Sequence, residues 1–95
     1  MERRLLSDDQ VAAELGKLDG WSVRGKSIVR KFEFGNFADA LAFINKAGEI
    51  ADAADHHPDI RLGWGYAEFE ITTHDRGGVT DVDFALAKKI DEIQG

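Results

Sequence analysis

The sequence predicts an α+β fold, a four-stranded antiparallel sheet with three helices on one face in the order α-β-β-α-β-β-α. Two pairs of β-rich runs are each joined by a short turn, around Gly25 and Gly65. Segments with helical periodicity precede, separate and follow these pairs. The chain has 95 residues, enough for one core, so we expect a single domain over residues 1–95.

The first helix is expected to begin after Ser7, because residues 7–10 have the form of a capping box. Val11, Leu15 and Leu18 then recur on one face of that helix. Gly20 stands where a left-handed C-terminal cap would end it. Residues 7–20 therefore predict a short helix with one apolar side.

The first hairpin is predicted from β-rich runs at residues 21–23 and 28–34, with Gly25 in the turn. Ile28, Phe32 and Phe34 share one face of the second run. We expect that face to meet the core.

The second helix is the longest expected element, and Asn36 is placed to cap its start. Its alanines, together with Gly48, favour close packing against the sheet or a neighbouring helix. Its expected apolar positions are Phe37, Leu41, Ile44, Ala47, Gly48 and Ala51.

The second hairpin is predicted from residues 59–64 and 66–73. Ile60, Leu62 and Trp64 share a face of its first run, and we expect Trp64 to pack in the core. Its second run has the clearest alternation in the chain. Ala67, Phe69 and Ile71 alternate there with Glu68, Glu70 and Thr72.

The last helix is expected to open at Thr80, because Thr80 and Asp83 have capping-box spacing. Its apolar stripe consists of Val82, Leu86, Ile90 and Ile93.

The composition excludes several classes of function. Twelve Lys and Arg residues against 18 Asp and Glu residues give a net charge of −6, which disfavours nucleic acid as a direct partner. The chain has no cysteine, so disulfides, thiolate metal sites and thiol nucleophiles are excluded. No stretch reaches membrane-spanning length, and we expect a cytoplasmic protein.

The three histidines lie at element boundaries, where sites are often built. His56 and His57 directly precede Pro58, which disfavours helix, so the two rings are expected to diverge. Asp52 lies four residues before His56 and could orient it as an acid or base. The alternative, that these groups form a solvated helix end, stays open. Taken alone, His74 is a polar residue that ends a strand.

Other chemistry fits the sequence less well. Adjacent histidines seldom bind one metal ion, and neither H-x-H nor H-E-x-x-H occurs, which disfavours a zinc site. The G-x-S-x-G nucleophile motif and the phosphate-binding glycine motifs are also missing. Histidine acid–base catalysis without a cofactor remains the simplest hypothesis.

The residues Asp52-x-x-x-His56-His57-Pro58, followed by Trp64, His74 and Asp83, closely resemble the signature of the pterin-4a-carbinolamine dehydratases. The resemblance covers essentially the whole chain. It implies an enzyme that removes water from 4a-hydroxytetrahydrobiopterin to give quinonoid dihydropterin, which recycles the cofactor of aromatic amino acid hydroxylases. It also implies that no metal and no cofactor are needed.

The resemblance implies catalytic roles for His56, His57 and His74. His56 and His74 correspond to the acid–base pair, without deciding which is the acid and which the base, and His57 corresponds to a residue that binds or orients the ligand. It implies that further residues bind the substrate: Asp52, Asp55, Pro58, Thr73, Asp75 and Asp83. The chain departs from the family at Ile60, where many members have tryptophan, and at Val82, where some have arginine. Both differences could alter pterin contacts.

The resemblance also implies a homodimer or homotetramer, since small domains with exposed sheet edges gain stability by assembly. A different class of function is a non-catalytic dimerisation or assembly-chaperone module with the same fold. A zinc hydrolase is the third hypothesis.

Overall fold

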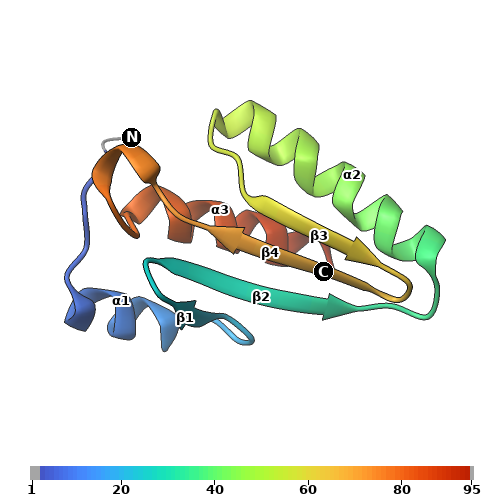
Figure 1. Ribbon diagram of the computed structural model, residues 1–95, viewed down its shortest axis with the longest axis horizontal. Coiled ribbons are helices and arrows are strands. Elements are labelled where there is room, and N and C mark those ends of the chain that lie inside the picture. The colour runs from blue at the N-terminus through green and yellow to red at the C-terminus, as the bar shows by residue number, and fades with distance from the viewer. Residues whose placement is uncertain (1–2, 95) are drawn as a thin grey trace.

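The four strands form one antiparallel sheet with the order β1-β2-β4-β3 (Figure 1). In this computed structural model, which describes residues 3–94, two hairpins build the sheet. The strands are β1 (Ser22–Arg24), β2 (Ser27–Glu33), β3 (Asp59–Gly63) and β4 (Tyr66–Ile71). The predicted alternation in β4 is confirmed, because its apolar residues are buried and its intervening residues are half-buried.

The helices lie against one face of this sheet, so the predicted α+β class and element order are confirmed. They are α1 (Asp8–Leu15), α2 (Phe37–Ala54) and α3 (Asp81–Ile93), with a 3₁₀ turn, η1 (His74–Arg76), before α3. Strand residues such as Ile28 and Phe69 share one hydrophobic cluster with Val11 of α1, Phe43 of α2 and Leu86 of α3.

The first helix is shorter than predicted, because α1 ends at Leu15 and not near Gly20. The N–H of Gly16 donates to the Ala12 carbonyl at 3.2 Å, and glycine at this point weakens helix continuation. Gly20 does have a left-handed φ of 87°, but it serves the turn into β1.

The buried face of α2 agrees with the predicted one at Ala47 and Ala51 and differs from it at the other fully buried positions. The face against the core contains Ala40, Phe43, Ala47 and Ala51. Phe43 packs against Phe32 of β2 with tilted rings, whose centroids are 4.6 Å apart. The expected close packing holds for these alanines and is wrong for Gly48, where an added Cβ would meet nothing within 4 Å.

A second apolar stripe on α2, its outer stripe, stays outside the core. Phe37 and Leu41 stay 44% and 39% exposed, although the sequence pattern placed them among the packed positions. Two adjacent apolar stripes run along this helix, and its periodicity alone does not say which one faces the sheet.

The prediction that Trp64 packs in the core is wrong, since Trp64 is 73% exposed. Gly63 pairs with Tyr66, so Trp64 and Gly65 form the two-residue turn between β3 and β4. Gly65 has φ 77°, which suits such a turn. Trp64 therefore lies at the hairpin tip, whereas Ile60 and Leu62 face the same side as Phe69 and Ala67.

Candidate active site

The end of α2 determines where two of the three histidines point. Asp55 adopts a left-handed conformation with φ 52°, and its N–H donates to the Asp52 carbonyl at 3.1 Å. The N–H of His56 donates to the Ala51 carbonyl, also at 3.1 Å. This pair of hydrogen bonds is a Schellman ending. It directs His56 into the protein and leaves His57 outside, so the expected divergence of the rings is confirmed.

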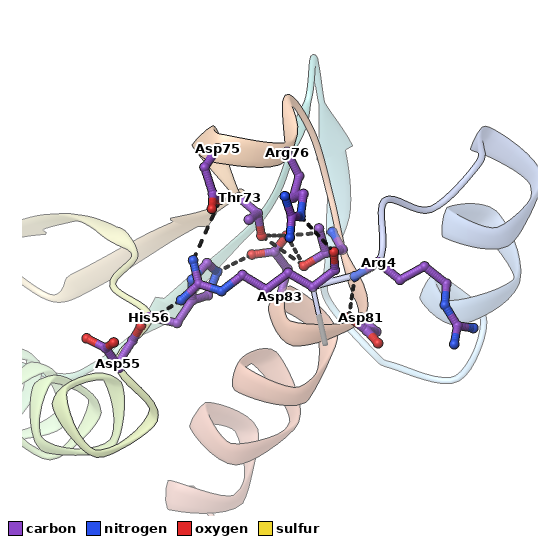
Figure 2. Close-up of polar contacts among 10 residues, drawn as sticks. Arg4, Asp55, His56, Thr73, Asp75, Arg76, Asp81 and Asp83 are labelled. Atoms are coloured by element: carbon purple, nitrogen blue, oxygen red, sulfur yellow. Dashed lines mark hydrogen bonds and ion pairs between the residues drawn. The ribbon is translucent and has the colours of Figure 1, made fainter. Parts of the chain in front are cut away.

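His56 is buried against Asp83, the acidic residue near the start of α3 (Figure 2). Its Nε2 lies 2.5 Å from Asp83 Oδ1, and the Asp83 side chain is fully buried. The other oxygen, Oδ2, accepts from the Thr80 N–H at 2.7 Å and from the Thr73 hydroxyl at 2.9 Å. The predicted capping contact between Asp83 and Thr80 is thus present, and the same carboxylate also holds the histidine.

The hydrogen bonds around Asp83 indicate the tautomer of His56. Asp83 already accepts hydrogen bonds from Thr73 and Thr80, and an ionised carboxylate has no proton to donate. We therefore assign the proton to Nε2, which then donates to Asp83. The second ring nitrogen, Nδ1, is then the one left for another partner. A histidine oriented by a buried carboxylate keeps a fixed tautomer and ring position.

His57 is paired with Asp52, and the expected contact between Asp52 and His56 is wrong. Asp52 Oδ1 lies 2.8 Å from His57 Nε2. Both side chains are largely exposed. The reason is that α2 ends at Ala54, so the chain turns away before a helical four-residue contact can form with His56.

The three histidines come together at one cleft of about 320 Å³. His74, which begins η1 and does not continue β4, lies across from the end of α2. The residues that line the cleft are Arg3, Asp55, His56, His57, Thr72, His74 and Asp75.

The remaining predicted site residues lie around this cleft without lining it. Thr73 is buried, and its hydroxyl donates to Asp83. Asp83 faces His56 inside the protein, Asp52 reaches the site through His57, and Pro58 lies next to His57 in the chain. The structure therefore separates cleft-lining residues from residues that support them.

Sequence reasoning missed two lining residues, Thr72 and Arg3. Thr72 follows β4 directly, one residue before the predicted Thr73. Arg3 had no signal in the sequence, because it is 52 residues away from Asp55, whose carbonyl it contacts. Only the folded chain brings it to the site.

Two larger hollows, of about 360 Å³ and 520 Å³, lie against α1, but neither is lined by a histidine. Within residues 3–94, no group of three or more histidine or acidic side chains has the arrangement of a metal site. No helix in that part of the chain is long and apolar enough to cross a membrane.

Comparison with known proteins shows which family this chain belongs to. A family described as pterin 4 alpha carbinolamine dehydratase matches residues 4–93. A protein of Sulfurisphaera tokodaii is 44% identical over 88 residues, which is 93% of this chain and 95% of the relative. One from Chloroflexus aurantiacus is 44% identical over 90 residues, 95% and 97% of the two chains. Both are provisionally named pterin-4-alpha-carbinolamine dehydratases.

Two solved structures have the same fold. A transcriptional coactivator/pterin dehydratase from Brucella melitensis has a TM-score of 0.91 and 33% identity, and the match covers 97% of this chain and 100% of that one. A pterin dehydratase-like protein, identified as a RuBisCO assembly factor in the alpha-carboxysome, has a TM-score of 0.68 and 24% identity over 80% and 90% of the chains. On the family match and the close relatives, this chain belongs to the pterin-4a-carbinolamine dehydratase family.

Proposed function

We propose that the protein dehydrates 4a-hydroxytetrahydrobiopterin to quinonoid dihydropterin and so recycles the cofactor of aromatic amino acid hydroxylases. One observation carries the proposal: His56, His57 and His74, from two separate parts of the chain, line a single cleft. Family membership agrees with this reaction class.

The reaction consists of two proton transfers and the loss of one water molecule. An acid protonates the 4a-hydroxyl, the C4a–O bond breaks, and water leaves. A base takes the proton from N5, and the electron pair of that N–H bond forms the C4a=N5 double bond. Histidine suits both steps, because its ordinary pKa of about 6.5 makes either form accessible near neutral pH.

Supporting residues hold the histidines ready for those transfers. Asp83 positions His56 from within the protein, and Thr73 positions Asp83. We therefore assign Asp83 and Thr73 to positioning, which refines the substrate-binding role that the resemblance implied. Asp55 and Asp75 line the cleft and are the acidic candidates for substrate contact.

The test is the dehydration of a synthetic 4a-hydroxytetrahydropterin, followed above its spontaneous rate. We expect the unchanged protein to accelerate it, EDTA to have no effect, and His56→Ala and His74→Ala each to lose most of the rate. Circular dichroism melts establish that the variants are folded. Full activity in both variants would contradict the assignment of the histidines.

A second candidate function is a dimerisation or assembly-chaperone module. Two observations favour it: the exposed apolar residues Phe37 and Leu41 on α2, and the similar fold of the RuBisCO assembly factor. This candidate predicts no dehydration together with stoichiometric recovery of one partner, and unaltered recovery after His74→Ala.

We also infer a homodimer or homotetramer. The strands β1 and β3 lie at the edges of the sheet with one side unpaired. The outer stripe of α2 supplies an apolar surface. Both features favour association between copies.

A further inference from the structure

Arg3 reaches the candidate cleft from the far end of the sequence. Residues 3–6 run beside the segment that leads into α3. The Leu6 N–H donates to the Val79 carbonyl at 2.9 Å, and Leu5 pairs with Thr80 in an isolated antiparallel bridge. The Arg76 side chain donates to the Arg3 carbonyl at 3.0 Å. Several independent contacts therefore fix the main chain around Arg3.

The Arg3 guanidinium joins the two walls of the cleft. One terminal nitrogen donates to the Asp55 carbonyl, at the end of α2, at 3.0 Å. The other lies 3.6 Å from Asp75 Oδ1, on the turn that carries His74. The side chain is only 33% exposed, so the folded protein already restricts it. Binding a ligand would therefore cost little further side-chain entropy.

The cleft offers few other fixed donors. Its remaining lining residues are two aspartates, three histidines and Thr72, whose hydroxyl donates to the Lys26 carbonyl. Arg3 is thus the one lining side chain whose polar atoms are all donors. A guanidinium has five N–H groups, and the two contacts above leave others for a ligand.

We propose that Arg3 binds the substrate by donating to the keto oxygen of its pyrimidinone ring. This inference rests on the proposed function, because it takes the ligand to be a pterin. A ring carbonyl that leaves water needs a donor in the site. Arg3 supplies one that its contacts with Asp55 and Asp75 hold in place. Its role is to bind the ring, while the histidines transfer protons.

The test compares Arg3→Ala, Arg3→Lys and Arg4→Ala, each made without an N-terminal tag. Arg4→Ala is the matched control: it removes the same charge from the next residue, and the contact of Arg4 with Asp81 comes from its main chain. We expect Arg3→Ala to raise KM about tenfold and to change kcat by less than about threefold. Arg3→Lys should recover part of the loss, and Arg4→Ala should match the unchanged protein.

Calorimetric titration with 7,8-dihydropterin supplies a readout without turnover, in which Arg3→Ala should bind about tenfold more weakly. A loss of kcat at constant KM and constant affinity would make Arg3 a structural clamp and overturn the proposal. Equal KM values and equal dihydropterin affinities for active Arg3→Ala and Arg4→Ala enzymes would also overturn the proposal. This outcome would leave the proposed function intact. Absence of both dehydration and pterin binding in the unchanged protein would instead overturn the proposed function itself.

Discussion

Asp55 has the only left-handed backbone among the non-glycine residues from 3 to 94. Such a conformation costs an ordinary side chain about 1–2 kcal/mol, and aspartate tolerates it better than most residues. The conformation is needed because it turns the chain so that His56 enters the protein. A locally unfavourable residue conformation thus lies directly before a proposed catalytic side chain.

The first prediction concerns this residue. Asp55→Gly should keep or slightly raise the free energy of unfolding, because glycine adopts the left-handed conformation without steric cost. Asp55→Ala should lower it by about 1 kcal/mol. Ala42→Gly, an exposed change inside α2, is the control and should lower the free energy of unfolding by about 1 kcal/mol, because glycine is a poor helix former. Urea denaturation measures all three. Equal losses in Asp55→Gly and Ala42→Gly would show that the left-handed turn is not what Asp55 provides.

The second prediction concerns Asp83, a fully buried carboxylate that is hydrogen-bonded to His56, Thr73 and Thr80. Asp83→Asn keeps the shape of the side chain but replaces one acceptor oxygen with an NH2 group. One of the groups that donate to Asp83 then loses its acceptor. We expect a loss of about 1–3 kcal/mol in stability and a fall of at least about tenfold in kcat.

The matched control for Asp83→Asn is Asp81→Asn. Asp81 lies two residues earlier, accepts only the Arg4 N–H among the described hydrogen bonds, and is partly exposed. Asp81→Asn also keeps the shape of the side chain, and it should leave kcat unaltered. An Asp83→Asn enzyme with unaltered kcat would remove Asp83 from the positioning of His56.

At the scale of elements, the polar face of the sheet is held by charge pairs between strands. Glu68 of β4 accepts from Arg61 of β3 and lies 3.3 Å from the Arg24 guanidinium of β1. These hydrogen bonds, that with Arg61 foremost, lower the pKa of Glu68 below its ordinary value of 4.5. The ionised form therefore links three strands.

The third prediction is a pH dependence from this group. Because folding lowers the pKa of Glu68, its contribution to stability is complete above about pH 5 and is lost as the pH falls below 4.5. Glu68→Gln should therefore flatten the acid limb of a plot of melting temperature against pH. Glu33→Gln, an exposed change on β2, is the control and should keep that limb. An unaltered acid limb in Glu68→Gln would contradict the role of Glu68.

At the scale of the whole molecule, the exposed stripe of α2 predicts self-association. Sedimentation of the unchanged chain should give a mass at least twice the 10.5 kDa of one copy. Leu41→Asp should shift it toward the monomer, because it places a charge on the apolar surface.

The control for assembly is Ala42→Asp, which adds the same charge to an exposed residue one position along α2. The new carboxylate lies about 100° around the helix axis from the position of Leu41. Assembly should survive this change. A monomeric unchanged chain, or equal effects of the two variants, would contradict an interface on the outer stripe.

Local patterns predicted most of the secondary structure because their causes are local. The capping residues Ser7, Asn36 and Thr80 each start a helix as expected, and the alternation in β4 matches its burial. The motif around His56 and His57 likewise predicted the family, since its spacing is readable without a structure.

The sequence by itself determined the element order, the helix starts and the family, and it singled out the three histidines that line one cleft. Tertiary structure alone decided which stripe of α2 is buried, that Trp64 lies at a hairpin tip, and that Asp83 and not Asp52 holds His56. It also decided that Arg3 joins the cleft. The physical reason is the same in each case. Hydrogen bonds within a few residues depend on local spacing, whereas these outcomes depend on which distant surfaces the packed core brings together.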